Sequence, residues 1–183
     1  MILSNSSNIT TWDFSVLNFI QKYIRCAPLD FFFKYFTHIG DKGIIWIIFT
    51  IIFICIKKYR KCGITTACGL ATELIIGNGI LKNIVQRDRP CWINKNIDML
   101  IAIPKDYSFP SGHTFASFIS ATIIFSFNKK LGITAYIIAF LIAFSRLYLY
   151  VHFPTDVIAG CLLGIVFGII IAYIANKIQI KQA

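Results

Sequence analysis

The sequence predicts an all-α integral membrane bundle of about five to six transmembrane helices, folded as one domain over residues 1–183. Of the 183 residues, 57% are hydrophobic and only 14% are charged, and the mean hydropathy is +0.71. A water-soluble domain of this length needs a more highly charged surface. No ten-residue alternation typical of a membrane barrel is present. Because backbone polar groups in lipid must pair within their own segment, we expect helices to cross the membrane.

Five apolar segments are the predicted spans of a bundle that covers residues 43–176. They are residues 43–56, 64–81, 114–127, 131–149 and 157–175. The first and third are shorter than the ~20 apolar residues that usually cross a hydrocarbon core. We expect neighbouring polar residues, or local thinning of the bilayer, to complete these two spans.

Residues 12–38 are predicted to form amphipathic helices at the membrane interface. Apolar residues recur at helical spacing from Phe14 to Ile24, with polar and basic residues between them. The Phe-rich stretch at 29–36 forms either a second short helix or, with the first, one irregular span. The polar start of the chain lacks the basic region and apolar core of a cleavable signal peptide.

The charges predict an orientation in the membrane. The 18 Lys and Arg residues outnumber the 8 Asp and Glu residues, which gives a net charge of +10. Basic clusters at 57–61, 129–130 and 177–181 predict cytoplasmic connections, because positively charged loops tend to stay inside. Residues 82–112 and 145–155 then face outward, where their cations suit an anionic ligand. No basic stripe with interleaved aromatics indicates nucleic acid.

The first unusual cluster is the segment KNIVQRDRP at residues 82–90. Lys82 and Arg89 are seven residues apart, so on a helix they return to nearly the same face and can approach one anion. Pro90 ends that helix. Taken alone, the cluster also fits a basic rim whose long side chains reach from a membrane helix toward the headgroups.

The second cluster is PSGH at residues 110–113, directly before an apolar run. Ser111 is a natural N-cap, and the free amides of the first helical turn form an anion seat at the positive end of the helix dipole. Gly112 lets an anion come close, and His113 would touch it. As a lone residue, His113 also fits an ordinary interfacial histidine.

The third cluster runs from Ser145-Arg146 to His152 and Asp156. Pro154 marks the first turn of a helix, which places Asp156 one turn along from His152. A carboxylate at the Nδ1–H group fixes the tautomer and leaves Nε2 as a nucleophile, which suits a phosphoryl-accepting histidine. Asp156 also fits a charge at a helix N-terminus, worth about 0.3–1 kcal/mol.

Together, the three clusters lie at one predicted membrane face and supply three cations, an amide seat and two histidines. The strings Lys82-x6-Arg89-Pro90, Pro110-Ser111-Gly112-His113 and Ser145-Arg146-x5-His152-x3-Asp156 resemble the three-part signature of the type 2 phosphatidic acid phosphatase superfamily. Their order and spacing match without gaps. The hydrophobicity of the chain favours the membrane branch over the soluble vanadium-dependent haloperoxidases of that superfamily.

This resemblance implies a phosphate cradle. Its members by position are Lys82, Arg89, Arg146, Ser111 and Gly112. The three cations would hold the phosphoryl oxygens and stabilise the charge that spreads over them in the transition state.

The resemblance also implies the catalytic roles. His152 would attack phosphorus with help from Asp156, and His113 would protonate the leaving oxygen. Three fixed cations can do the electrostatic task of a divalent ion, so we expect no metal and no cofactor. The six cysteines form no CxxC pair or Cys/His cluster that indicates zinc.

The implied substrate is a lipid phosphate in a bacterial cell membrane, reached from the outer side. Undecaprenyl diphosphate is our first choice, because compact members of the family with an outward site often act on it. Phosphatidylglycerol phosphate or phosphatidate is the alternative for an enzyme of broader specificity. A nonenzymatic transporter of anions or lipid phosphates is the alternative from another class, and it predicts binding or flux without turnover.

Three charged residues near the motifs have structural interpretations. Glu73 lies nine residues before Lys82, half a helical turn out of phase. We therefore expect Glu73 to point away from the site and to pack in the bundle with a polar partner. Arg87 and Asp88 are expected on a solvated surface, because helical phase separates Arg87 from the motif cations.

Overall fold

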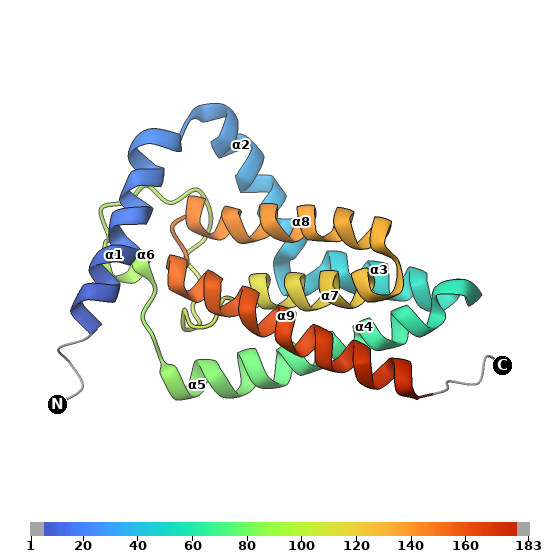
Figure 1. The fold of residues 1–183 in the computed structure, drawn as a ribbon. Helices are drawn as coiled ribbons and strands as arrows, with labels where there is room; N and C mark the ends of the chain where they lie inside the picture. Colours follow the sequence, from blue (N-terminus) through green and yellow to red (C-terminus); the bar gives the residue numbers. More distant parts are fainter. Residues whose placement is uncertain (1–5, 179–183) are drawn as a thin grey trace.

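The computed structural model describes residues 6–178, which form helices and loops without a strand (Figure 1). The helices before the outer loop are α1 (Ser6–Phe19), the π-helix η1 (Ile20–Ile24), α2 (Ala27–Phe36), the 3-10 segment η2 (Thr37–Gly43), α3 (Ile44–Cys55), the 3-10 turn η3 (Lys57–Tyr59), α4 (Arg60–Thr72), the π-helix η4 (Glu73–Leu81) and α5 (Lys82–Val85). The others are α6 (Pro90–Ile93), α7 (Gly112–Phe127), α8 (Lys129–Tyr148) and α9 (Pro154–Lys177). The predicted all-α class is confirmed.

The predicted spans fall on α3, on α4 with η4, and on α7, α8 and α9. Segments long and apolar enough to cross a membrane cover Ala27–Cys55, Lys57–Ile93, Lys129–Tyr148 and Pro154–Lys177, and α7 is a shorter apolar helix. The short first span is completed by the polar η2, which joins α2 to α3. The chain is therefore a multi-pass membrane protein.

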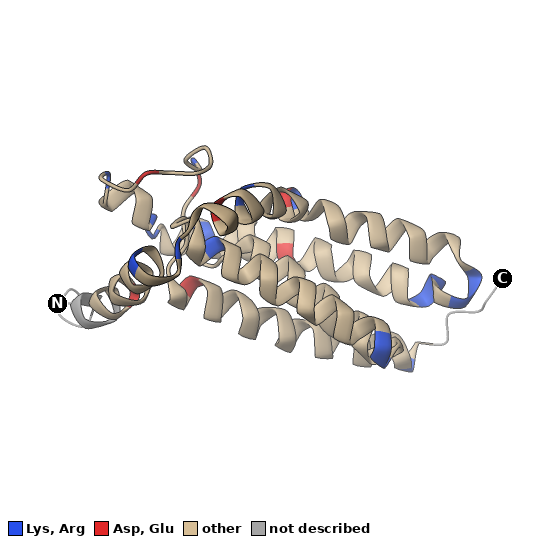
Figure 2. Ribbon diagram, turned by 90° about the horizontal axis from the view of Figure 1, so that it is seen from above, with Lys and Arg blue, Asp and Glu red and all other residues tan. Residues whose placement is uncertain are grey.

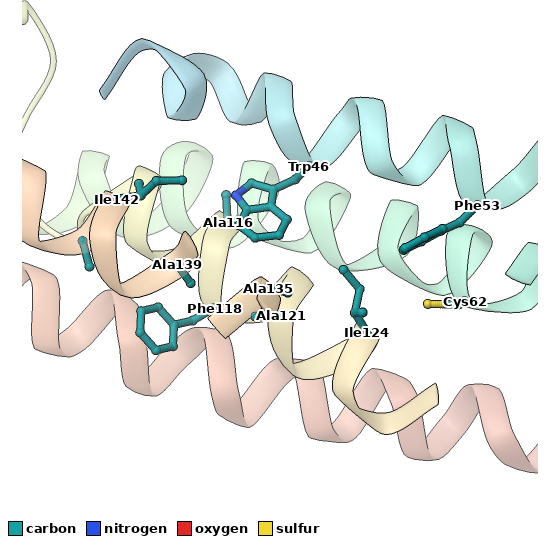
Figure 3. Close-up of a cluster of buried hydrophobic side chains, with 11 residues drawn as sticks. Trp46, Phe53, Cys62, Ala116, Phe118, Ala121, Ile124, Ala135, Ala139 and Ile142 are labelled. Carbon is teal, nitrogen blue, oxygen red and sulfur yellow. The ribbon is translucent and has the colours of Figure 1, made fainter. Parts of the chain in front are cut away.

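Helix α7 occupies the centre of the bundle, with α4, α8 and α9 around it. Its side chains are buried along most of its length. Because protein and not lipid surrounds α7, its 16 residues do not have to match the thickness of the hydrocarbon core. Figure 3 shows one part of this core, in which Trp46, Phe118 and Ile142 come from α3, α7 and α8. The indole Nε1 of Trp46 donates to Ser117 Oγ at 2.9 Å, so α3 is also fixed to α7 by a buried polar contact.

Helices α7 and α9 approach closely because glycines line the contact. Gly160, Gly164 and Gly168 recur every four residues on α9, the spacing of small residues that lets membrane helices touch along their backbones. A β-carbon at Gly164 would lie 2.6 Å from Phe118 Cβ, and one at Gly160 would lie 2.8 Å from Ser111 O. This contact holds the start of α7 against the start of α9, where two of the three motifs meet.

The two ends of the bundle differ in chemistry. The connections α3–α4 and α7–α8 and the end of α9 lie together at the end nearer the C-terminus (Figure 1). Lys and Arg lie at both ends, but among the described residues Asp and Glu lie only toward the other end, so this end is purely basic (Figure 2). The loop over residues 86–111 and helix α1 lie at the opposite end, with α1 crossing the bundle instead of running along it (Figure 1). The described residues thus place the three motifs at the end opposite the basic clusters. That α1 and α2 lie at a membrane interface stays a prediction.

Candidate active site

A cavity of about 710 Å³ opens at the end of the bundle that carries the motifs. The motif residues in its lining are Lys82, Arg89, Gly112, His113, Arg146 and His152. Ser111 and Asp156 are fully buried behind this lining. The three sequence clusters are therefore brought together as predicted, by α5 and the following loop, the start of α7, and the connection from α8 to α9.

Arg89 is held by backbone carbonyls that aim its guanidinium into the cavity. Its Nε donates to Asp106 O at 2.7 Å, and one terminal nitrogen donates to Val151 O at 2.8 Å. The same nitrogen lies 3.0 Å from His152 Nε2. Arg89 is thereby fixed beside the imidazole.

The predicted helix that carries Lys82 and Arg89 on one face and ends at Pro90 is wrong. Helix α5 ends at Val85, and Pro90 instead begins α6.

Arg146 has a donor left over. One terminal nitrogen donates to Thr37 Oγ1 of η2, a residue outside the three motifs. Its Nε is buried without a hydrogen-bond partner among the described residues. An unpaired buried donor is costly unless a ligand satisfies it. Because Arg146 lines the cavity, a phosphoryl oxygen is a suitable acceptor for this group.

Asp106 bridges two of the cations, a contact that sequence reasoning missed. One carboxylate oxygen accepts from Arg89 at 2.8 Å and the other pairs with Lys82 Nζ. Burial opposes ionisation, but the hydrogen bond from Lys82 and the charge of Arg89 lower the pKa of Asp106 to about 2. The side chain is still 54% exposed. The only sequence signal for this residue was its place in the outer loop, next to Lys105, where Asp88 and Asp98 are equally acidic.

His152 is buried and its tautomer is defined by its neighbours. Arg89 donates toward Nε2, which must then carry the lone pair, so the ring proton is on Nδ1. Nδ1 lies 3.3 Å from Ser108 Oγ and 3.7 Å from Asp156 Oδ2. Ser108 in turn donates to Asp156 Oδ2. The predicted direct contact is therefore replaced by one in which Ser108, which the motifs did not include, lies between imidazole and carboxylate.

The environment of His152 keeps the imidazole neutral. Burial and then the charges of Arg89 and Arg146 hold the pKa of His152 well below its ordinary value. A neutral ring with a lone pair on Nε2, directed at a cationic cavity, is the form that a nucleophile requires.

Arg87 is a support for Asp156, which corrects its predicted place on a solvated surface. One terminal nitrogen donates to Asp156 Oδ1 at 2.5 Å and the other to Asp13 Oδ2 at 2.6 Å. Asp13 lies on α1 and also accepts from Thr155 N at 3.0 Å. Gln86 has a left-handed backbone conformation and ends α5. Arg87 is therefore not part of the helix, and its predicted place on the surface, which assumed a continuous helix, is wrong.

Glu73 also departs from its predicted position. It lines the cavity, and a β-carbon on Gly112 would lie 3.1 Å from its Oε1. The expected polar partner is present, since Asn78 Nδ2 donates to Glu73 Oε1 at 2.8 Å. Residues 73–81 form a π-helix, whose i→i+5 hydrogen bonds make each turn wider by about one residue. Nine residues therefore make about two turns, and Glu73 lies on the same side as Lys82.

His113 contacts residues that lie far upstream in the chain. Its Nε2 lies 3.0 Å from Asp41 Oδ1, and the other oxygen of Asp41 lies 2.7 Å from His38 Nδ1. Both partners belong to η2. Sequence reasoning placed residues 37–43 at the edge of a span and missed them as part of the site. A Gly-Asp-Lys-Gly string between apolar segments was the available signal.

Among the described residues, no group of three or more His, Cys, Asp or Glu side chains is placed to hold a metal ion. The cavity is lined by Lys42, Lys82, Arg89 and Arg146 together with the separate carboxylates of Asp41, Glu73 and Asp106. Independence from metal stays a prediction.

Comparison with known proteins agrees with this geometry. The sequence profile of the PAP2 superfamily matches residues 62–180. The undecaprenyl-diphosphatase of Sulfolobus acidocaldarius is 32% identical over 152 residues, which are 82% of this chain and 71% of that protein. The bacitracin transport permease protein BcrC of Bacillus licheniformis is 40% identical over 122 residues, and the match covers 67% of this chain and 60% of that protein. The crystal structure of a PAP2-type phosphatidylglycerolphosphate phosphatase from Bacillus subtilis has a TM-score of 0.78 and 26% identity, with coverage of 98% and 91%.

Proposed function

Since the chain belongs to the PAP2 superfamily and is a membrane lipid phosphate hydrolase, we propose that it cleaves undecaprenyl diphosphate through a phosphohistidine on His152. One observation carries this mechanism. The neutral Nε2 of a buried histidine opens onto a cavity where Lys82, Arg89 and Arg146 converge. Those three cations suit a phosphoryl group, and the nucleophile lies beside them.

Binding replaces contacts that the protein makes within itself. Phosphoryl oxygens take the positions that the Asp106 carboxylate holds on Lys82 and Arg89, and a third oxygen accepts from Arg146 Nε. The hydrogen bond from Arg89 then passes from His152 Nε2 to the phosphoryl group. The Nε2 lone pair is thereby freed next to phosphorus.

In the first chemical step, the Nε2 lone pair of His152 forms a bond to phosphorus while the bond from phosphorus to the leaving oxygen breaks. His113 gives its proton to that oxygen. The imidazolium character that develops on His152 is stabilised through Ser108 by the Asp156 carboxylate. Arg87 keeps this carboxylate in place from its other side.

In the second step, water attacks the phosphohistidine and the nitrogen–phosphorus bond breaks. His113, now neutral, accepts a proton from this water and returns to its starting form. Inorganic phosphate leaves, and His152 regains its lone pair. No divalent ion is needed, because the three cations neutralise the charge on the equatorial oxygens throughout.

A specific observation also favours a second substrate, phosphatidylglycerol phosphate. A structural relative that matches 98% of this chain is a phosphatidylglycerolphosphate phosphatase. The first choice rests instead on the undecaprenyl-diphosphatase relative. Both lipids present a terminal phosphoryl group to the same cations, so the difference between them lies in the leaving group.

We also infer that the site faces the extracytoplasmic side of a bacterial cell membrane. The basic connections lie at the opposite end of the bundle (Figure 2), and positively charged loops favour the cytoplasm. Single cysteines at positions 58 and 105 in a cysteine-free background test this. An impermeant maleimide on intact cells should label position 105 and not 58, and the reverse pattern would invert the orientation.

The function is tested with detergent-purified protein in excess EDTA. We expect phosphate release from undecaprenyl diphosphate and phosphatidylglycerol phosphate, with the higher kcat/KM for the former. Vanadate should inhibit by occupying the cation cradle. Loss of activity in EDTA with recovery on adding zinc or magnesium would overturn the metal-free mechanism, and binding of both lipids without phosphate release would support a carrier in place of an enzyme.

A further inference from the structure

We propose that Asp41 and His38 of η2 act as positioning residues for His113, so that the leaving-group acid is part of a His38–Asp41–His113 relay. The inference deepens the proposed function and rests on it. Its basis is the geometry of a segment that lies outside the three motifs.

The relay begins with two short contacts to one carboxylate. Asp41 Oδ1 lies 3.0 Å from His113 Nε2, and Asp41 Oδ2 lies 2.7 Å from His38 Nδ1. A carboxylate that accepts from Nε2–H fixes the tautomer of the ring and stabilises the imidazolium form. That effect is needed at this site, because burial and then the charges of Arg146 and Lys82 oppose a second proton on the ring and lower the pKa of His113 to about 4, although the contact with Asp41 acts in the other direction.

The contact also assigns a role to each nitrogen of His113. Nε2 is committed to Asp41, while Nδ1 has no hydrogen-bond partner among the residues from 6 to 178. His113 itself lines the cavity. Nδ1 is therefore the nitrogen from which we expect the leaving oxygen to take its proton, with Asp41 on the far side of the ring in the role that Asp156 has for His152.

The backbone of η2 is shaped to bring Asp41 to the ring. A β-carbon at Gly40 would lie 2.9 Å from His113 Cδ2, so only glycine lets the segment come this close. Asp41 leaves the helical conformation with ψ 127°, and Lys42 has φ 51°. A positive φ is unfavourable for lysine, and such residues often mark functional sites. The turn directs the Asp41 side chain into the cavity instead of continuing the helix.

His38 holds the other oxygen of the carboxylate at the cavity mouth. Its side chain is 58% exposed, and that of Asp41 is 43% exposed. An unassisted carboxylate at such a position would be free to turn toward solvent, and two imidazole contacts restrict it to one rotamer. Asp41 therefore acts directly on His113, and His38 acts through Asp41.

The test compares Asp41→Asn with wild type on an alkyl lipid phosphate and on 4-nitrophenyl phosphate. We expect kcat on the alkyl substrate to fall roughly 10–100-fold with little change in KM, and on the aryl substrate by less than about threefold, because nitrophenolate leaves without a proton. His38→Gln should show the same pattern at smaller size. The exposed Asp88→Asn is the matched control and should be unaffected on both substrates.

Combination with His113→Ala separates positioning from a general structural role. If Asp41 acts through His113, then adding Asp41→Asn to His113→Ala should cost less than about a further twofold. Equal losses on both substrates, or losses that multiply in the double variant, would overturn the relay. If wild type itself releases no phosphate, the proposed function fails. If His113→Ala depends on the leaving group but Asp41→Asn does not, this inference alone fails.

Discussion

The two histidines of the site sit in opposite surroundings. His152 is 1% exposed, and its contacts come from the loop over residues 86–111 and from the start of α9. His113 lines the cavity with its side chain 20% exposed, and its carboxylate partner Asp41 is 43% exposed. Both are Asp–His arrangements, but one is enclosed and the other is open.

This difference matches what each step requires. A nucleophile has to present one lone pair at one angle for every substrate, so a rigid and dry setting helps. An acid that serves the leaving group has to meet whatever lipid is attached and then handle water, so it belongs where the cavity opens. Disruption of the enclosed side should therefore affect all substrates alike, and disruption of the open side should depend on the leaving group.

The largest expected effect is that of His152→Ala. Without a nucleophile the variant should be inactive on alkyl, aryl and diphosphate substrates alike, because no covalent intermediate forms. Rapid quench with a ³²P-labelled substrate should trap an acid-labile, base-stable label on wild type and none on the variant. Equal label on both proteins would show that another residue is phosphorylated.

The second effect is that of His113→Ala, and the size of the loss in activity should depend on the leaving group of the substrate. On an alkyl lipid phosphate we expect a loss of roughly 10²–10⁴-fold, the usual size of general acid catalysis. On a diphosphate or aryl phosphate the loss should be smaller, since those leaving groups are already stable anions. Steady-state kcat values over a series of leaving groups measure this. A loss of one size across the series would mean that His113 binds phosphate instead of donating a proton.

The third effect tests the support behind the nucleophile. Arg87→Gln removes the donor that joins Asp156 to Asp13 of α1. We expect a loss on the order of 10–100-fold, typical when a supporting hydrogen-bond partner is removed, and of equal size on alkyl and aryl substrates. Arg25→Gln is the matched control, because Arg25 contacts Asp30 and Asp98 and does not reach Asp156. Similar losses in both variants would indicate that α1 docking matters, and not Asp156.

The motif residues on both sides of the site were predictable from sequence, and most of the residues that support them were not. The structure gathers Lys82, Arg89, Arg146 and His152 as predicted, but Lys82 and Arg89 meet across a loop and not on one helix face, because α5 ends at Val85. Ser108 and Asp106 belong to an irregular loop, where residue spacing carries no information about direction. Asp41 lies 72 residues from its partner His113, and such a contact depends on how whole helices pack.

Glu73 shows a second reason why sequence reasoning fails. An α-helix has 3.6 residues per turn, but Glu73–Leu81 form the π-helix η4, so the direction predicted for Glu73 is wrong. No simple sequence pattern predicts a π-helix, but such segments are frequent at functional sites. The fold class and the order of spans did not depend on this detail, because hydropathy determines them.

A smaller effect is expected at Asp106, which holds two cations in the absence of substrate. Asp106→Asn removes a competing anion, so KM should fall. The fall should stay below about fivefold, because exposed ion pairs contribute only about 0.2–1 kcal/mol. With its pKa lowered to about 2, Asp106 is ionised throughout pH 5–8, and the ratio of variant to wild-type KM should be constant there. A rise in KM or a tenfold loss of kcat would show that Asp106 positions the cations instead.

The last prediction is that the protonation state of His152 does not change as the pH falls from 7.5 to 5.5. An ordinary histidine, with a pKa near 6.5, becomes mostly protonated between pH 7.5 and pH 5.5. Burial, and then the charges of Arg89 and Arg146, hold the pKa of His152 well below that value, so it should stay neutral over this range. The chain has only three histidines, so ¹⁵N spectra of protein labelled in the imidazole nitrogens can be assigned with His38→Gln and His113→Gln. The remaining signals should show the Nδ1–H tautomer with unprotonated Nε2 at both pH values.

The same low pKa affects stability. Below about pH 6.5, His152 binds a proton in the unfolded state but not in the folded state, so the free energy of unfolding of the wild type should decline with acid. Protonation of His152 by pH 5.5 would contradict the enclosed, cation-flanked setting on which the contrast with His113 depends.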